Sequence, residues 1–228
     1  MIKLDNVFLN YPDYSNSGRY LRNLIFTLKK KKIYHFEILK NINLTIKKGD
    51  RIGIIGNNGS GKTTLLKVLS GLLPVTSGSI HFEDKILSIL NINSGLDDYL
   101  SARDNIITLN LINNLKDNLD KYDIEKILDF AELKKYENQP LKTFSSGMKL
   151  RLSFSVLTYI KPKCLILDEW LSVGDTNFRE KSINRLNEII SSSEIFVIAS
   201  HDNDLIKRLC NKIIKIENGK IINIYENL

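Results

Sequence analysis

The sequence predicts an α/β protein with a parallel sheet, into which a group of helices is inserted. Strand-like runs alternate with helical patterns along most of the chain, and this order is typical of parallel sheets. A glycine-rich loop joins a short apolar run at residues 51–55 to a helical pattern at 62–69. Residues 104–136 carry helical spacing and no convincing strand, which indicates the inserted helices.

The N-terminal part is predicted to contain a strand, a helix and a second strand. The strand-like runs lie at 2–9 and 38–46, and turn residues follow the first of them at Tyr11, Pro12 and Asp13. Between the two strands, apolar residues from 20 to 28 recur at helical spacing. Four lysines at 29–32 suit the C-terminal end of that helix, where the helix dipole favours cations.

The glycine-rich loop is flanked by two well-defined elements. The run at 51–55 is nearly all apolar and rich in isoleucine, which predicts a strand buried on both faces. A helix is expected at 62–69 directly after the loop. The short runs at 79–82 and 86–90 are separated by turn residues, so we expect them to pair as a hairpin.

The C-terminal third continues the alternation of strands and helices. We expect strands at 164–167 and 195–199, helices at 177–190 and 202–209, and a terminal hairpin that turns at Asn218 and Gly219. No internal repeat or linker divides the chain, so one domain is expected.

The composition excludes several classes of protein. The 228 residues are 43% hydrophobic, and the two cysteines, Cys164 and Cys210, are too few for a disulfide framework, so an intracellular protein is expected. No apolar stretch approaches the roughly 18 residues that span a bilayer, and the first residues lack the apolar core of a signal peptide. With 33 Lys and Arg against 26 Asp and Glu, the net charge of +7 points to an anionic partner without identifying it.

The most specific motif is the glycine-rich loop, which matches the phosphate-binding P-loop pattern in full. Its glycines let successive backbone N–H groups point at a β-phosphate, and the helix that follows adds partial positive charge. Lys62 would reach the β- and γ-phosphates, and the Thr63 hydroxyl would bind Mg²⁺. The alternative is a chance glycine-rich turn, but the flanking strand and helix favour the P-loop. The nucleotide-binding residues expected here are Gly56, Asn57, Asn58, Gly59, Ser60, Gly61, Lys62, Thr63 and Thr64.

A second candidate site is the pair of acids that ends the strand at 164–167. Nucleotides bind at the carboxyl edge of parallel sheets, so Asp168 is expected to hold Mg²⁺ and Glu169 to polarise the water that attacks the γ-phosphate. On their own the two acids are equally well explained as the start of a helix. The presence of the P-loop favours the catalytic interpretation.

Two further motifs are less specific by themselves. His201 follows the strand at 195–199, where it could contact a γ-phosphate or serve as a structural cap. Ser145, Ser146 and Gly147 precede a helical pattern at 150–160. Small residues at a helix N-terminus can bind an anion or simply cap the helix, so the meaning of both motifs depends on their order in the chain.

The order of these motifs resembles the nucleotide-binding subunits of ABC transporters, and the resemblance covers essentially the whole chain. It implies a P-loop NTPase core with a parallel sheet, an N-terminal antiparallel β subdomain and an inserted helical subdomain that carries the signature motif. The approximate bounds are 1–90 and 161–228 for the core with its β subdomain and 91–160 for the helical subdomain, within one ABC ATPase domain of residues 1–228.

The resemblance also implies roles for single residues, with ATP and Mg²⁺ as cofactors. In the family, signature residues of one subunit contact the γ-phosphate bound by the other, so Ser145 and Gly147 are expected to act across a head-to-tail homodimer that Asp175 supports. Tyr11 matches the aromatic residue that stacks on adenine; the alternative is a turn tyrosine, and Tyr20 is a weaker rival. The catalytic residues are expected to be Lys62, Asp168, Glu169 and His201.

Departures from the general family pattern indicate one branch. The signature reads Phe-Ser-Ser-Gly-Met at 144–148, where most members have Leu-Ser-Gly-Gly-Gln, and a long insertion lies between Tyr11 and Ile38. With the sequence Trp-Leu-Ser-Val-Gly-Asp at 170–175, these features resemble the ATPases that export O-antigen, capsular polysaccharide or teichoic acid.

The branch implies a peripheral ATPase on the cytoplasmic face of the inner membrane. Its partners would be a separately encoded transmembrane permease, a second copy of the chain and, indirectly, a lipid-linked glycan; no nucleic acid is expected. Two alternatives stay open, namely an ATPase of another transport class and a soluble ABC protein that acts on DNA or the ribosome.

Two details are left open by the sequence. The glutamine that the family carries near position 92 is missing, and Asn91 or Asn93 could replace it. The basic segment 19–32 is either a solvated helix surface or a helix whose lysines face anionic headgroups.

Overall fold

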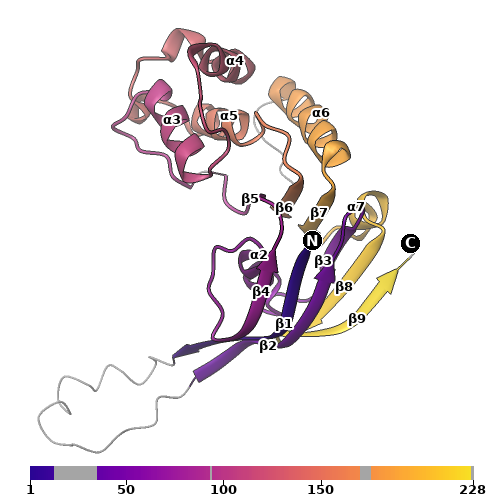
Figure 1. The fold of residues 1–228 in the computed structure, drawn as a ribbon. Coiled ribbons are helices and arrows are strands. Elements are labelled where there is room, and N and C mark those ends of the chain that lie inside the picture. Colours follow the sequence, from indigo (N-terminus) through magenta and orange to yellow (C-terminus); the bar gives the residue numbers. More distant parts are fainter. Residues whose placement is uncertain (13–34, 93, 170–175, 227–228) are drawn as a thin grey trace, which may run out of the picture.

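The computed structural model describes residues 1–12, 35–92, 94–169 and 176–226. In these residues the chain forms two β-sheets and a separate group of helices (Figure 1). The expected helix at 20–28 and the basic segment 19–32 lie outside the described residues.

The smaller sheet is antiparallel and contains β1 (Ile2–Pro12), β2 (His35–Ile46) and β4 (Ser77–Phe82) in the order β2-β1-β4. Side chains alternate between buried and exposed along β1 and β2, as expected of strands with one face on a core. The antiparallel β sheet expected from the N-terminal part is therefore confirmed, and β4 adds a third strand to it.

The larger sheet has the order β5-β6-β7-β3-β8-β9. All neighbouring strands in it are parallel except β8 and β9, which form the expected terminal hairpin. The central strands consist almost entirely of buried residues, which explains their unbroken apolar sequences. The bounds are β3 Arg51–Ile55, β5 Ile86–Ile89, β6 Cys164–Asp168, β7 Ile195–Ala199, β8 Lys212–Glu217 and β9 Lys220–Glu226.

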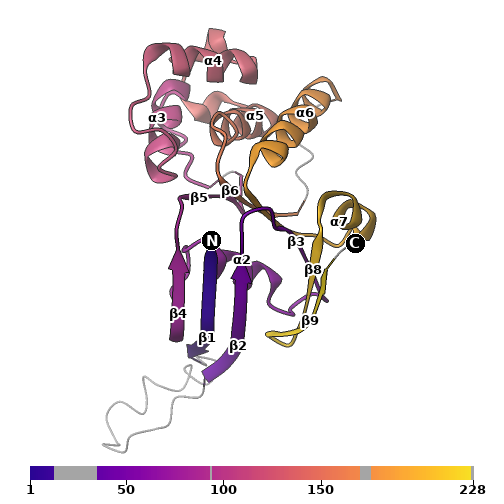
Figure 2. The same cartoon turned by 45° about the vertical axis from the view of Figure 1, so that its right-hand side comes forward.

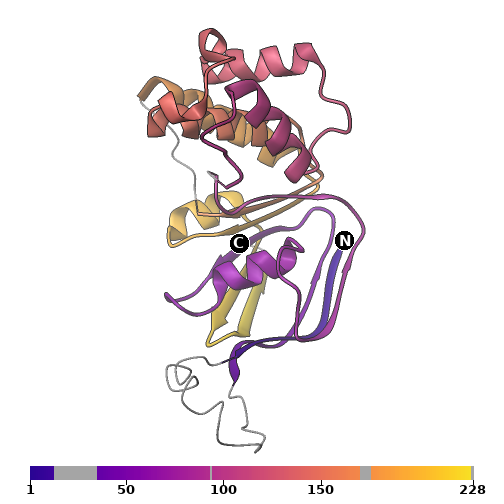
Figure 3. The ribbon, with the colours of Figure 1, turned by 90° about the vertical axis from the view of Figure 1, so that its left-hand side faces the viewer.

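Helices follow three strands of the large sheet, as the alternating sequence predicts. They are α2 (Lys62–Leu69), α6 (Thr176–Ser192) and α7 (Asn203–Leu209). α6 and α7 connect parallel strands, and α2 leads from β3 to β4 of the small sheet. The apolar face of α2 is buried in one core with residues of both sheets, so α2 lies between them (Figure 3). This position holds the start of α2 close to the edge of the large sheet.

The predicted hairpin between 79–82 and 86–90 is wrong. β4 pairs with β1 in the small sheet, whereas β5 pairs in parallel with β6 in the large sheet. The two strands also bury their side chains differently. Ile80 and Phe82 of β4 pack against the core between the sheets, whereas β5 adds only Ile86 to that core and buries Leu87 and Ile89 in the core on the other side of the large sheet. Adjacency in sequence suggested pairing, but each strand buries its apolar side chains better with a distant partner.

The inserted helices are α3 (Ala102–Ile112), α4 (Lys121–Ala131) and α5 (Ser146–Leu157), with short 3₁₀ turns at Lys134–Tyr136 and Leu141–Thr143. They share a core of their own, built from residues such as Ile106, Leu128 and Leu152. The helices lie at one end of the molecule, away from the small sheet (Figure 2). The stretch 104–136 contains helices and no strand, as expected, with a loop at 113–120 between α3 and α4. α5 begins four residues earlier than the predicted helix at 150–160. None of the helices in the described residues is long and apolar enough to cross a bilayer.

Candidate functional site

Three loops meet at the carboxyl edge of the large sheet. β6, β7 and β3 are neighbours in the sheet, and their registers align Asp168 with Ala199 and Ala199 with Ile54. The loops that follow these strands therefore lie side by side. Together they enclose a pocket of about 480 Å³. The lining residues are Ile38, Asn58, Gly59, Gly61, Lys62, Thr63, Thr64, Asp168, Glu169 and His201.

The P-loop has the tight shape that its glycines predict. Gly59 and Gly61 adopt positive φ angles of 76° and 108°, which residues with a Cβ rarely adopt. A Cβ at Gly56 would lie 2.3 Å from the carbonyl oxygen of Ile216, so only glycine allows β8 to approach the loop this closely. The loop is thus fixed by its own backbone conformation and by its neighbour strand.

The loop concentrates hydrogen-bond donors. The Lys62 ammonium is buried and donates to the carbonyl oxygens of Gly56 and Asn57, at 2.9 Å and 3.2 Å. The residue before α2, Gly61, has no side chain to cap the helix, and the first turn carries no acidic residue. The Ser60 hydroxyl is buried and has no hydrogen-bond partner among the described residues. This set of donors fits a phosphate group.

The pocket also offers oxygen ligands of the kind that Mg²⁺ prefers. The Thr63 hydroxyl and the Asp168 carboxylate line the same pocket as Lys62. Hard oxygen donors beside a phosphate site are the usual setting for this cation. The residues present therefore fit Mg²⁺ as well as a nucleotide phosphate.

Glu169 is held in an unusual conformation. Its φ angle of 69° lies in the left-handed region, and its N–H donates to the Ala199 carbonyl at 2.9 Å. The Ser200 hydroxyl donates to the Glu169 carboxylate at 3.4 Å, and the His201 Nε2 atom lies 3.9 Å from the other carboxylate oxygen. Backbone strain of this kind persists where the surroundings hold it and is common at functional sites. The strain directs a half-exposed carboxylate to the edge of the pocket.

The signature residues lie elsewhere in the chain. Ser145 is the N-cap of α5, and its hydroxyl accepts a hydrogen bond from the Met148 N–H at 3.2 Å. Ser145, Ser146 and Gly147 are all exposed, and none of them lines the pocket. A Cβ at Gly147 would meet only the Ser145 hydroxyl, at 3.9 Å, so nothing in its own chain requires a glycine there.

Several residues that the sequence singled out are not brought to the pocket. Tyr11 is 45% exposed on β1 opposite Phe36 of β2, and neither aromatic residue lines the pocket. The Asn91 carbonyl accepts from the Ser94 N–H in the loop after β5, also outside the lining. Asp175, Tyr20 and Asn93 lie outside the described residues.

Two residues at the site were given no role by the sequence. Ile38 lines the pocket from β2, and Ser200 hydrogen-bonds the Glu169 carboxylate. Ser200 directly follows β7 and precedes His201, and this position was the sequence signal that could have assigned it to the site. Ile38 is one of several apolar residues in β2, and only the tertiary structure shows that this strand reaches the P-loop.

Comparison with known proteins identifies the family. The family model described as ABC transporter matches residues 39–172. The chain belongs to the ABC transporter family. The expected resemblance is thereby confirmed, and the ABC ATPase fold is confirmed by solved structures. MJ0796, titled a bacterial ABC transporter cassette, has a TM-score of 0.70 at 23% identity, covering 99% of this chain and 98% of that one.

Curated relatives of this ABC family member are named as ATP-binding proteins of export systems. The O-antigen export system ATP-binding protein RfbE of Yersinia enterocolitica is 37% identical over 224 residues, which cover 95% of this chain and 94% of the relative. The teichoic acids export ATP-binding protein TagH of Levilactobacillus brevis is 36% identical over 220 residues, which cover 96% of this chain and 60% of the relative.

Proposed function

We propose that this chain is the ATP-binding and ATP-hydrolysing subunit of an exporter whose cargo is a lipid-linked polysaccharide of the O-antigen, capsule or teichoic acid kind. The observation that carries the ATPase assignment is the single pocket in which the P-loop, Asp168, Glu169 and His201 meet. The cargo assignment is supported by relatives with O-antigen and teichoic acid export names along nearly the whole chain.

The P-loop residues 56–64 bind the phosphates of ATP in this proposal. The Lys62 ammonium exchanges the Gly56 and Asn57 carbonyls for phosphate oxygens, which are stronger partners because they are charged. Thr63 and Asp168 would hold Mg²⁺, which supplies positive charge that neutralises the phosphates. The backbone N–H groups at the start of α2 add a fixed positive field at no cost of reorganisation.

Glu169 acts as the general base. Its carboxylate accepts a proton from the water that attacks the γ-phosphate, and the Ser200 hydrogen bond orients that carboxylate. His201 lies beside Glu169 and is half-exposed, which suits a contact to the γ-phosphate oxygens.

A second copy of the chain completes each site. Ser145, Ser146 and Gly147 are exposed at the start of α5, where a helix N-terminus favours anions, but they are outside the pocket of their own chain. We infer that they contact the γ-phosphate bound by the partner in a head-to-tail homodimer, with Asp175 at the dimer contact and Tyr11 on the adenine ring. ATP favours the closed dimer because its γ-phosphate gains ligands only there, and hydrolysis removes that difference in affinity.

The transmembrane permease is proposed to dock on α3. Three of its apolar side chains are exposed, namely Ile107, Leu111 and Ile112, at 37%, 67% and 63%. Three exposed apolar side chains on one helix favour it as an interaction surface and support this proposal. Docking there would place the chain at the cytoplasmic face of the membrane, and no nucleic acid partner is needed.

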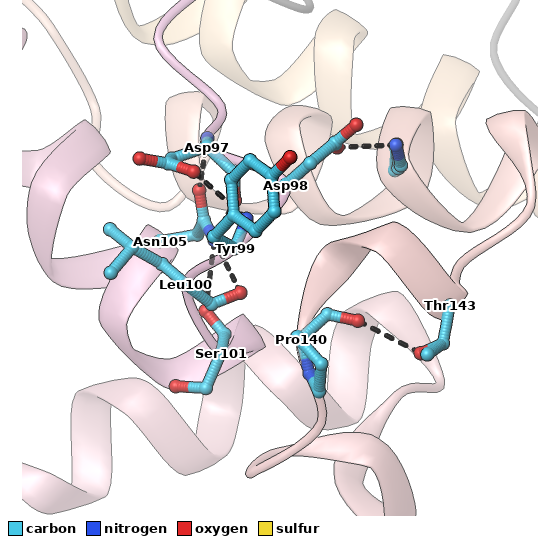
Figure 4. A network of polar contacts seen from close by, with 9 residues as sticks. Asp97, Asp98, Tyr99, Leu100, Ser101, Asn105, Pro140 and Thr143 are labelled. Atoms are coloured by element: carbon cyan, nitrogen blue, oxygen red, sulfur yellow. Dashed lines mark hydrogen bonds and ion pairs between the residues drawn. The ribbon is translucent and has the colours of Figure 1, made fainter.

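A hydrogen-bonded loop links α3 to the signature helix (Figure 4). The Asn105 amide binds the loop at 97–101 to the start of α3, and Asp98 of that loop pairs with Lys149 of α5. The Lys142 N–H, just before the signature, donates to the Asp98 carbonyl at 2.8 Å. These contacts connect the proposed permease surface on α3 to Ser145.

We also propose that residues 1–228 form one ABC ATPase domain, with 91–160 as its helical subdomain.

The variant Glu169→Gln tests the proposal. The amide cannot accept the proton from water, so ATP binding should persist while turnover falls by roughly a hundredfold or more. Light scattering with excess ATP and Mg²⁺ should show a stable dimer, and expression of the variant in cells should leave the lipid-linked polymer at the inner face of the membrane. Monomers alone under these conditions, or turnover equal to wild type, would contradict the assignment; Glu180→Gln, a glutamate on α6, is the matched control.

A further inference from the structure

The turn between β8 and β9 reaches across to the P-loop. Asn218 and Gly219 form a two-residue hairpin turn with φ angles of 48° and 76°. The Gly219 N–H donates to the Ser60 carbonyl at 2.9 Å, and the Lys40 N–H of β2 donates to the Gly219 carbonyl at 2.8 Å. One turn residue therefore bonds to the P-loop on one side and to the small sheet on the other.

Only glycine fits at this position. A Cβ at Gly219 would lie 2.1 Å from the carbonyl oxygen of Ile38 and 2.9 Å from its carbonyl carbon. Both are backbone atoms of a paired strand, so no side-chain rotation can relieve the contact. The positive φ angle excludes most other residues as well.

The same junction encloses the P-loop along one side. Ile38 lines the pocket, and a Cβ on Gly61 would already meet Leu39 at 3.3 Å. Ile216 of β8 closes on Gly56 in the same way. The catalytic acids, in contrast, come from β6 and the histidine from the loop after β7, on the other side of β3.

We propose that Gly219 is a positioning residue for the nucleotide site. It fixes the Ser60 peptide and thereby the amide groups that hold the β-phosphate, without contacting the nucleotide itself. The inference rests on the proposed ATP site and adds a residue that lies far from the P-loop in sequence. Its effect is on nucleotide affinity, because the turn touches the loop and not the residues that perform hydrolysis.

The test is Gly219→Ala. The new Cβ displaces the turn and breaks its hydrogen bond to Ser60, so the Kd for ADP and the KM for ATP should both rise by about tenfold or more. The kcat at saturating ATP should stay within about threefold of wild type. The reason is that Glu169 and His201 follow β6 and β7, which lie on the other side of β3 from the turn. Calorimetric titration with ADP and steady-state kinetics measure these values. A general loss of folding would instead lower the active fraction and leave the Kd of the remaining sites unchanged.

Gly49→Ala is the matched control. Gly49 has a φ angle of 87°, so alanine there carries a similar backbone cost, but its Cβ would meet nothing within 4 Å. Gly49 lies in the turn before β3, at the end of that strand remote from the P-loop. This variant should lose some thermal stability through its backbone conformation and keep the nucleotide affinity of wild type.

Hydrogen exchange in the unmodified chain keeps the proposal testable if Gly219→Ala does not fold. Addition of ADP should slow exchange at the Gly219 amide together with the P-loop amides. Protection of the P-loop without protection of Gly219, or equal affinities in the two glycine variants, would overturn the positioning role. If the unmodified chain binds neither ADP nor ATP, it is the proposed ATP site that fails.

Discussion

At the scale of single residues, Asn105 shows how one buried amide can organise an irregular loop. Its side chain is fully buried, and its amide nitrogen reaches the carbonyls of Asp97, Leu100 and Ser101 at 2.9, 3.2 and 2.9 Å. Its oxygen accepts the Asp97 N–H at 2.8 Å. Figure 4 shows these groups converging on the amide from one turn of chain. The loop thus has its polar groups satisfied without regular secondary structure.

Replacement of this amide should be costly. Asn105→Ala leaves several buried polar groups without partners, so the free energy of unfolding should fall by about 2 to 4 kcal/mol. Asn113→Ala, at the C-terminal end of the same helix, removes one hydrogen bond to the Leu109 carbonyl from a half-buried side chain and should cost about 1 kcal/mol or less. Urea unfolding of both variants measures the difference, and equal losses would refute the role given to Asn105.

At the scale of elements, Asp123 joins three parts of the helical group. Its side chain completes a capping box with Asp120 at the start of α4. The same carboxylate accepts hydrogen bonds from Lys116 in the α3–α4 connection and, at 2.6 Å, from Tyr159 after α5. Burial raises the pKa of Asp123, but the hydrogen bonds from Lys116 and Tyr159 outweigh it and hold the pKa at about 2. For Tyr159, burial and the Asp123 hydrogen bond both raise the pKa, to about 12.

This carboxylate predicts part of the acid sensitivity of the fold. Its pKa is lower in the folded chain than the ordinary 3.8, so its contribution is complete above about pH 4 and is lost as the pH falls toward 2. The contribution is about 1 kcal/mol after allowance for solvent screening of the Lys116 pair. Urea unfolding between pH 5 and pH 2, a range set by these pKa values, should be less pH-dependent in Asp123→Asn. Asp117→Asn, an exposed partner of Lys85, should follow wild type; identical curves for all three would disprove the assignment.

At the scale of the whole molecule, the residues of the proposed ATP site lie in two separate places on the chain, which is why the proposed assembly contains a second copy and a permease. The pocket contains the P-loop, the acids and His201, whereas the signature residues face solvent at the start of α5. The exposed side of α3 is the surface proposed for the permease, and the loop at 97–101 lies between these two surfaces. In the proposed assembly, this loop connects the permease surface on α3 to the signature residues at the start of α5.

The permease surface can be tested with two exposed leucines. Leu111 on α3 is 67% exposed and Leu72 after α2 is 63% exposed, so serine at either position alters the fold little. Leu111→Ser should reduce the amount of the genetically neighbouring permease that copurifies from detergent-solubilised membranes, and Leu72→Ser should not. The ATPase activity of the isolated chain should be unchanged in both. Equal capture by both variants, or copurification with nucleic acid or ribosomes in place of a permease, would contradict the proposed assembly.

Much of the fold follows from local pattern. The unbroken apolar runs predicted β3, β6 and β7 because strands buried on both faces need no polar alternation. The P-loop was also predictable from local sequence, since its glycines determine the backbone conformation and its lysine lies in the same eight residues. The pairing of β4 with β1 was missed, because the sequence between β4 and β5 resembles a hairpin turn and the competing partners are far away in the chain.

The sequence by itself therefore determined most of the described elements and the nucleotide motifs, which depend on residues close together in the chain. It also determined the family, through the order of those motifs along the chain. Only the tertiary structure decided which strands pair, that Ile38 and Ser200 belong to the site, and that the Gly219 turn supports the P-loop. The physical reason is that backbone conformation and periodic burial are set by neighbours in sequence. Pairing and contact depend on which distant surfaces best bury apolar area and satisfy backbone hydrogen bonds together.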